Sequence, residues 1–216
     1  MNLRQSPASI ARRVAARYGE WRDDSLDRKY GIDTSGAAMP AADSGGRASA
    51  PHGYHYEPIQ LAVFDRIMRA LPHDPAGLAF VDLGSGKGRA LMLAALRGFR
   101  RVIGVEYDEN LHRIAQRNVA RFVDRARPRV SIELRCADAL TFRLPDEDCL
   151  CFLYNTFDHE GMVQAMAGID DSLRKRPRRL LIAYRNPRHS DVLCAARFLR
   201  CLERNRSFQL YEAATW

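Results

Sequence analysis

A buried strand that runs directly into a glycine-rich turn and then into a helix constrains this chain more than any other feature. The segment begins at Phe80 and passes through Gly84, Gly86 and Gly88 to Arg89, where an alanine- and leucine-rich stretch follows. Glycines tolerate positive φ angles, and without a Cβ they let a ligand lie against the backbone. Backbone amides at the start of the following helix favour an anionic group. The segment therefore predicts a βα unit that binds a cofactor at its turn.

Short apolar runs alternate with helical patterns along much of the remaining chain. Strands are expected at residues 79–83, 102–105, 130–135, 150–154 and 180–184, and helices at 89–96, 111–122 and 160–173. This alternation is typical of right-handed βαβ units and of a parallel sheet with helices on both faces. Two further apolar stretches flank Asn205 and predict a closing antiparallel hairpin, although a helix over 190–204 is also compatible with the pattern. We expect an α/β fold of the Rossmann-like kind.

The first 53 residues differ in character from the rest of the chain. Ser6 and Pro7 suit the start of a helix whose apolar residues recur at helical spacing as far as Trp21. Residues 31–53 are rich in Gly, Ala, Ser and Pro, which is typical of a linker or a mobile lid. We therefore expect a helical extension with a flexible linker or lid over 1–53, and a cofactor-binding domain over 54–216.

The positive charge of the chain suits a nucleic-acid partner at first sight. The formal net charge is +8, but the 34 basic residues include only three lysines, Lys29, Lys87 and Lys175. Such an excess of arginine is typical of a GC-rich coding bias, and arginine stems also cover helix faces. The basic run from Arg174 to Arg179 is either a solvated helix end or a patch for an acidic partner. Nucleic acid is therefore possible but not favoured.

Cysteine usage and apolar run lengths indicate the compartment. The five cysteines include no Cys-x-x-Cys pair, so we expect small buried hydrophobic residues in a reducing environment and no metal site. No apolar run reaches the length of a membrane span, and no signal-peptide pattern is present. A cytoplasmic protein without membrane contact is expected.

An acidic residue, Glu106, follows at the end of the second predicted strand. A carboxylate at that place can accept hydrogen bonds from both hydroxyls of a ribose. A P-loop would need Ser or Thr after Lys87, where Gly88 stands, and a dinucleotide fingerprint would need glycine at Arg89. The spacing disfavours a nicotinamide-dependent oxidoreductase, which is kept as the alternative.

The run from Val81 to Arg89 resembles motif I of class I S-adenosylmethionine (SAM)-dependent methyltransferases, and Gly104-Val-Glu106 resembles their acidic second-strand motif. The segments 136–139 and 153–157 are similar to the parts that hold the adenine and lie beside the transferred methyl group. The resemblance spans about residues 54–216 and implies a methyltransferase with SAM as its cofactor. It implies cofactor contacts from Tyr56, Asp82, Gly84, Ser85, Gly86, Gly88, Glu106, Tyr107, Asp138, Ala139 and Asn155.

A closer likeness is to a largely uncharacterised bacterial group of class I enzymes. These carry a tract like Asp27-Arg-Lys-Tyr-Gly-Ile-Asp-Thr34, then Tyr56-Glu-Pro58, then this motif I. The group usually reads Asn-Pro-Phe where this chain has Thr156 in the middle. Motif I and the Tyr-x-Pro segment also resemble protein-lysine methyltransferases with the class I fold.

On the acceptor side, Asn155 is the candidate catalytic residue, because its amide could orient an acceptor amine at the carboxyl edge of the sheet. The alternative is that Asn155 caps the next helix. Asp158 is expected as an N-cap, and His159 and His189 as surface residues. Tyr56 either contacts the cofactor near its sulfonium or packs at the start of a helix. A protein lysine or a small molecule is the favoured acceptor.

Overall fold

The computed structural model describes residues 24–36 and 56–214. The expected N-terminal helix over residues 6–21 lies outside these ranges. Residues 24–30 are helical. The other helices are α2 (Leu61–Ala70), α3 (Arg89–Leu96), α4 (Glu109–Ala126), α5 (His159–Lys175) and α6 (Ser190–Ala195), with a 3-10 turn at Pro75–Gly77. The strands are β1 (Ala79–Leu83), β2 (Arg101–Glu106), β3 (Ile132–Cys136), β4 (Cys149–Tyr154), β5 (Leu180–Arg185), β6 (Leu199–Arg204) and β7 (Phe208–Ala213).

The strands form one sheet in the order β3-β2-β1-β4-β5-β7-β6. The first five are parallel, and β7 joins β5 antiparallel and forms a hairpin with β6. The Rossmann-like expectation is therefore confirmed, including the closing hairpin. The alternative of a helix over 190–204 is wrong, because α6 ends at Ala195 and β6 follows.

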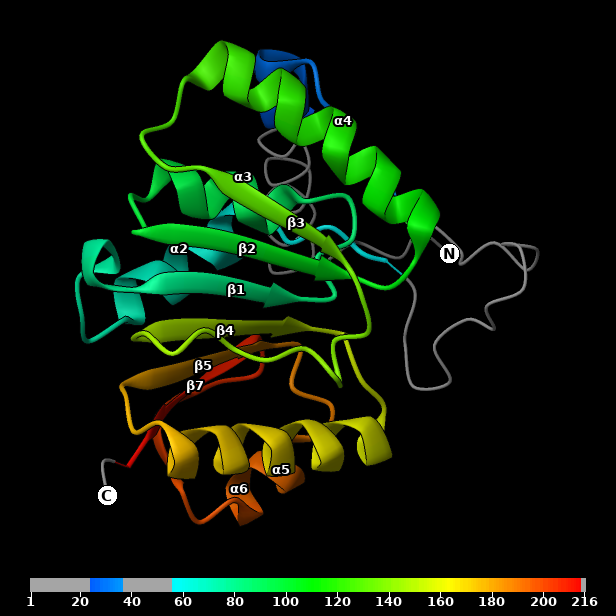
Figure 1. Ribbon diagram of the computed structural model, residues 1–216. Helices are drawn as coiled ribbons and strands as arrows, with labels where there is room; N and C mark the ends of the chain where they lie inside the picture. Colours follow the sequence, from blue (N-terminus) through cyan, green and yellow to red (C-terminus); the bar gives the residue numbers. More distant parts are fainter. Residues whose placement is uncertain (1–23, 37–55, 215–216) are drawn as a thin grey trace, which may run out of the picture.

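Two hydrophobic cores cover the two faces of the sheet (Figure 1). One joins α2, α3 and α4 to residues such as Phe80 and Phe152, and the other joins α5 and α6 to residues such as Val81 and Leu153. Successive residues of β1 and β4 thus face opposite cores, as the pleat of a strand requires. This double burial explains why the central strands read as continuous apolar runs.

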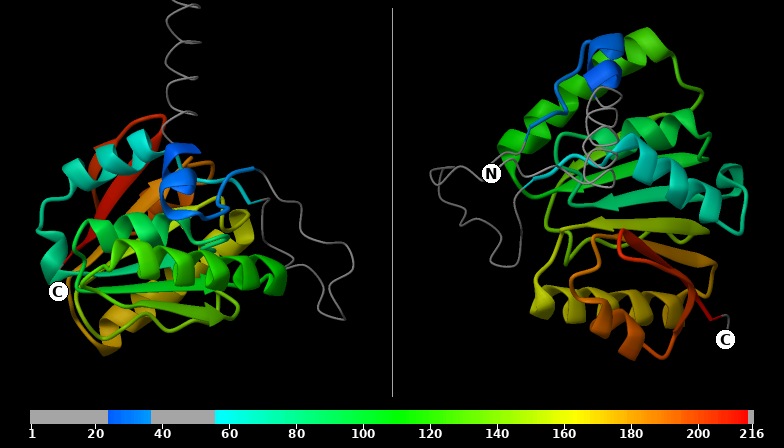
Figure 2. Two further views of the ribbon diagram at one scale, coloured as in Figure 1. Left: turned by 90° about the horizontal axis from the view of Figure 1, so that it is seen from above. Right: turned by 180° about the vertical axis from the view of Figure 1, so that it is seen from behind.

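Residues 31–36, which the sequence assigns to a linker, are packed onto the domain. Ile32 is 7% exposed and Thr34 is fully buried. Tyr30 contacts Phe122 of α4 edge to face, with ring centroids 5.0 Å apart. Figure 2 shows this segment beside α4, above the carboxyl ends of the strands. The division of the chain at residue 53 stays a prediction.

Within the described ranges, no helix combines the length and the apolar character needed to cross a bilayer.

Candidate cofactor and acceptor site

The loop between β1 and α3 forms the floor of the site. Gly84, Gly86 and Gly88 have φ angles of 82°, 54° and 87°, in the left-handed region that glycine enters at least cost. The backbone amides of Gly84 and Ser85 both donate to the carbonyl oxygen of Val105, at 2.8 and 2.9 Å. The loop is thereby tied to the end of the neighbouring strand β2.

Glu106 closes one side of this loop and is 8% exposed. Its Oε2 accepts a hydrogen bond from the Gly86 amide at 2.7 Å, and its Oε1 accepts one from the Asp108 amide at 2.8 Å. A carboxylate oxygen has two lone pairs, so each oxygen can still accept from a ligand hydroxyl. Burial raises the pKa of Glu106. The geometry is compatible with the expected ribose contact, which stays a prediction.

Asp82 lies in β1 next to this carboxylate and is 3% exposed. Burial raises the pKa of Asp82 well above its usual range, and the nearby charge of Glu106 raises it further. Two carboxyl groups thus share one poorly solvated region beneath the loop.

Tyr56 lies on the loop from above. A Cβ built on Gly86 would come within 2.2 Å of Tyr56 Cδ2, so Tyr56 itself requires a glycine at this position. The Tyr56 hydroxyl donates to the carbonyl oxygen of Thr34 at 2.7 Å. The ammonium of Lys87 lies 5.6 Å from the centre of the Tyr56 ring. The structure therefore brings Tyr56 to the glycine loop, and its contact with the cofactor stays a prediction.

The segment after β3 joins the same edge of the sheet. The Ala137 amide donates to the carbonyl oxygen of Glu106 at 3.0 Å. Asp138 Oδ1 accepts from the Leu140 amide at 2.9 Å, so this carboxylate stabilises its own turn. Asp138, Ala139 and Tyr107 are all half-buried. The adenine contacts of Asp138 and Ala139 and the cofactor contact of Tyr107 stay predictions.

Asn155 directly follows β4 and has a left-handed φ of 50°. Its Oδ1 accepts from Asn186 Nδ2 at 2.8 Å, and its Nδ2 donates to Glu57 Oε2 at 3.3 Å. The cap of α5 is Asp158, whose Oδ1 accepts from the Gly161 amide at 2.8 Å. The expectation for Asp158 is confirmed, and the alternative that Asn155 caps this helix is wrong.

Thr156 stands where the bacterial group that the sequence resembles usually has proline. Its Oγ1 donates to the carbonyl oxygen of Leu83 at 2.6 Å. Its Cγ2 would lie 3.0 Å from a Cβ at Gly84. Thr156 therefore packs the β4 loop closely against the glycine loop, while Phe157 is buried in the core beneath α5.

Two residues on the acceptor side, Glu57 and Asn186, were not predicted from the sequence. Glu57 accepts a hydrogen bond from Asn155 Nδ2 at 3.3 Å, and burial together with the nearby Glu57 carboxylate raises the pKa of Tyr154. Asn186 occupies the same place after β5 that Asn155 occupies after β4, because Tyr154 and Arg185 pair in register. The sequence signal that could have identified Asn186 is therefore that an asparagine follows each of these two strands.

His159 lies at the surface, as expected, whereas His189 is half-buried. His159 Nε2 is 3.1 Å from Asp191 Oδ2, and both side chains are more than half exposed. The rings of His159 and His189 are 5.7 Å apart. Across residues 24–36 and 56–214, there is no group of three or more His, Cys, Asp or Glu residues placed to hold a metal ion.

The cysteine expectation is only partly right. Cys149 and Cys151 are buried, but Cys136, Cys194 and Cys201 are exposed. Cys136 is the last residue of β3 at the sheet edge, and Cys201 lies in the outer strand β6. An edge strand lacks the second neighbour that would cover it.

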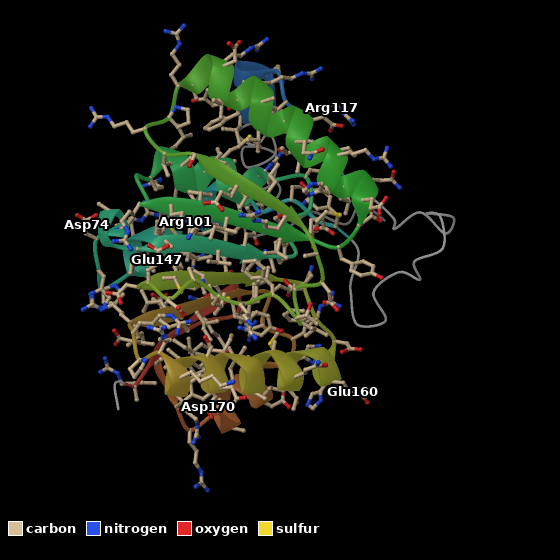
Figure 3. The ribbon with its side chains drawn as sticks, viewed as in Figure 1. Asp74, Arg101, Arg117, Glu147, Glu160 and Asp170 are labelled. Carbon is tan, nitrogen blue, oxygen red and sulfur yellow. The ribbon has the colours of Figure 1, made fainter. Side chains whose placement is uncertain are left out.

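The basic run at the end of α5 contains arginines that pair with acidic side chains. Arg174 bonds to Asp170 at 2.9 Å, and Arg179 lies 3.6 Å from Asp148. Another basic cluster joins Arg101 to Glu133 and Glu147. Figure 3 labels Arg101 and Glu147 near the amino ends of the strands, away from the glycine loop. These contacts favour the solvated helix end over a patch for an acidic partner.

The sequence model of a family described as "Methyltransferase domain" matches residues 80–176, which contain the glycine loop, Glu106 and Asn155. Residues 80–176 are a class I methyltransferase domain. The chain thus carries a methyltransferase domain, for which SAM is the cofactor that motif I and Glu106 imply. No curated protein matches the chain.

Solved structures resemble the fold of this methyltransferase at low identity. A suggested methyltransferase from Pseudomonas syringae is 14% identical, with a TM-score of 0.51 over 70% of this chain and 96% of that one. The suggested methyltransferase YhhF from Escherichia coli is 13% identical, with a TM-score of 0.52 over 73% and 88%. A protein of the NADB-Rossmann superfamily from Streptococcus agalactiae is 15% identical, with a TM-score of 0.50 over 73% and 69%. These likenesses concern the fold alone.

The residues of the methyltransferase site fit its cofactor. Glu106 retains lone pairs beside the glycine loop, while Tyr56 and Thr156 pack against the backbone at Gly86 and Gly84. The motif residue Arg89 is 2% exposed and donates to Thr34 Oγ1 at 2.6 Å. Its bulk occupies the place where a dinucleotide fold needs glycine.

Proposed function

We propose that the methyltransferase transfers the methyl group of SAM to an amine nitrogen of a protein lysine or of a small molecule. The observation that carries this proposal is the carboxylate of Glu57, which accepts a hydrogen bond from Asn155 at the carboxyl end of β4 and lies near Tyr154. Glu57 directly follows Tyr56, which lies on the cofactor loop. An acidic and an amide side chain therefore meet where the acceptor of a class I enzyme must approach.

The chemistry asks for positioning more than for acid–base catalysis. SAM supplies a methyl group already activated by the adjacent sulfonium, and the acceptor must present a lone pair in line at about 3–3.5 Å. An acceptor that arrives as an ammonium would first lose a proton to water, which exposes its lone pair; a carbon–nitrogen bond would then form as the carbon–sulfur bond breaks, leaving S-adenosylhomocysteine and the methylated ammonium. Glu57 and the Asn155 carbonyl oxygen can accept the N–H bonds of an amine and orient its lone pair.

The charges around Glu57 support a cationic or amine acceptor over an anionic one. Glu57 is exposed, so an incoming ammonium can reach it. The Arg185 guanidinium donates to the carbonyl oxygen of Ser207 at 2.8 Å and lies 5.2 Å from the centre of the Tyr154 ring. Arg185 is thus engaged in packing, and Glu57 is the charged group that contacts Asn155.

The alternatives receive less support. An oxidoreductase of the dinucleotide-binding kind would need glycine, for close packing of helix on strand, at the position of the buried Arg89. A nucleic-acid methyltransferase would use a basic surface, yet Arg174, Arg179 and Arg101 are paired with acids.

Radiolabelled SAM and fractionated lysate test the proposal. We expect the label in methylated lysine after acid hydrolysis of protein, or in a methylated small amine. Glu57→Gln should lower kcat/KM for that acceptor about tenfold or more, because it removes the charge that attracts an ammonium. The affinity for S-adenosylhomocysteine should stay within about twofold. Asp171→Asn, an equal charge change at the far end of α5, is the matched control and should leave both unchanged. Label in nucleic acid, or on carboxyl oxygens as base-labile esters, would overturn the amine assignment.

A further inference from the structure

The tract from Asp27 to Ser35 forms a closed turn held by one carboxylate. Asp27 Oδ2 accepts from the backbone amides of Thr34 and Ser35 at 2.8 and 2.9 Å. Its Oδ1 accepts from the Thr34 hydroxyl at 2.6 Å, and Oδ2 also accepts from the Ser35 hydroxyl at 2.9 Å. These bonds give the tract a defined shape although it contains no strand.

Arg89 anchors this turn to the first residue of α3. Arg89 is 2% exposed, and its Nε donates to Thr34 Oγ1 at 2.6 Å. Its Nη2 lies 3.1 Å from Ser35 Oγ and 3.4 Å from Asp27 Oδ1. A buried guanidinium is tolerated only when its donors are satisfied and its charge is paired. The burial of Arg89 therefore depends on the tract being in place.

The tract in turn determines where Tyr56 lies. The Tyr56 hydroxyl donates to the carbonyl oxygen of Thr34, the residue whose hydroxyl Arg89 holds. The Tyr56 ring lies on Gly86, and the Gly86 amide donates to Glu106. A continuous set of contacts thus leads from a buried ion pair outside the glycine loop to the carboxylate expected to hold the ribose.

A second set of contacts holds the tract from the side of α4. The Asn118 side chain accepts from the Asp33 amide at 2.9 Å and donates to the Asp33 and Lys87 carbonyl oxygens at 2.8 and 3.0 Å. Lys87 Nζ donates to the carbonyl oxygen of Ser35 at 2.8 Å. Both side chains of motif I that could have met a phosphate, Lys87 and Arg89, are instead bonded to the tract.

We propose that Asp27 and Arg89 are positioning residues for cofactor binding: they hold Thr34, and through it the Tyr56 ring, as the wall of the SAM site above the glycine loop. They act through Tyr56 and do not touch the reacting atoms. This inference rests on the cofactor side of the site and is independent of the amine acceptor.

A double-mutant cycle on S-adenosylhomocysteine binding tests the inference in the full chain. Arg89→Lys keeps the charge but loses the planar fork that reaches both Thr34 and Ser35. We expect it to raise the Kd by calorimetry about tenfold, and Tyr56→Phe, which frees the ring from Thr34, to raise it several-fold. The double variant should bind no more weakly than the weaker single variant, because both changes release the same ring. Effects that multiply, or an unchanged Kd in Arg89→Lys, would overturn the inference.

Controls separate positioning from loss of structure. Arg97→Lys is the matched control, because Arg97 bonds to Asp65 at the opposite end of α3 from Arg89; its Kd should match that of the wild type. Thr34→Ser keeps the hydroxyl and should bind normally, whereas Thr34→Val should resemble Arg89→Lys. With saturating SAM, kcat of Thr34→Val should return to within about twofold of the wild type while the KM for SAM stays raised. A fall in kcat that saturation does not restore would contradict a role confined to the cofactor.

The binding assay contains no acceptor, so its failure leaves the proposed amine chemistry intact. Conversely, label found in nucleic acid would overturn the acceptor proposal and would leave the result of the double-mutant cycle unchanged.

Discussion

The carboxylate of Glu106 accepts a hydrogen bond from the backbone amide of Gly86 at 2.7 Å, which joins the acid of β2 to the glycine loop of β1. The other oxygen accepts from the Asp108 amide at 2.8 Å, at the cap of α4. One side chain therefore shapes the loop and the start of a helix before a ligand binds. Substitutions at Glu106 consequently act on the loop and on the ligand together.

Glu106→Gln preserves size but replaces one acceptor oxygen with an NH2 group, which cannot accept from a backbone amide. We expect the affinity for S-adenosylhomocysteine to fall about tenfold or more. Because burial raises the pKa of Glu106, acidification should weaken wild-type binding from a higher pH than an ordinary glutamate would require. Calorimetry as a function of pH should show this step in the wild type and in the control Glu160→Gln. Its persistence in Glu106→Gln would refute the assignment.

Asp82→Asn should stabilise the fold at neutral pH. The pKa of Asp82 is raised above its unfolded value, so its favourable contribution is complete below the unfolded pKa and is lost as pH rises through the folded one. A buried neutral amide avoids that loss. We expect a melting temperature about 2–4 °C higher than wild type near pH 8, and a smaller difference at acid pH. A gain of equal size at both pH values would show that charge is not the cause.

Thiol reactivity should divide the cysteines into two classes. Burial raises the pKa of Cys149 to about 12 and that of Cys151 well above the usual range, so both stay protonated thiols. A soluble aromatic disulfide at pH 8 should modify Cys136, Cys194 and Cys201 in the native protein, and the other two only after denaturation. Peptide mapping by mass spectrometry identifies the modified cysteines. Rapid labelling of Cys151 in the native state would contradict its burial.

Thr156→Val removes the hydroxyl that donates to the Leu83 carbonyl oxygen while keeping the branched shape that packs on Gly84. We expect the free energy of unfolding to fall by about 1 kcal/mol, the usual net value of one such hydrogen bond. Thr156→Ser, which keeps the hydroxyl, should lose less than Thr156→Val. Urea denaturation of both variants measures these free energies of unfolding. Equal losses would assign the role of Thr156 to packing alone.

Local pattern was sufficient for much of the fold. β1 and α3 were predicted with the bounds that the structure has, because the glycine turn marks the end of one and the start of the other. The helix α4 was predicted too short, as 111–122 instead of Glu109–Ala126. Its first turn carries the polar residues Glu109 and Asn110 after the cap Asp108, and polar residues leave no apolar periodicity to read.

The acceptor side could be predicted only in part. Asn155 was found because it follows a strand, but its partner Glu57 lies 98 residues away in sequence. The tract at Asp27 was noticed for its likeness to a bacterial group and was otherwise assigned, from residue 31, to a linker. Its polar and small residues gave no periodic signal, since they serve hydrogen bonds to one carboxylate rather than a hydrophobic face.

The sequence alone determined the Rossmann-like fold and the cofactor loop, because strand burial, glycine turns and the spacing to Glu106 are properties of short continuous segments. Tertiary structure alone decided that Arg89 pairs with Asp27, 62 residues earlier, that Tyr56 lies on Gly86, and that Glu57 meets Asn155. Such contacts depend on where the sheet and helices place distant parts of the chain, and a hydrogen bond between them leaves no trace in the order of the residues.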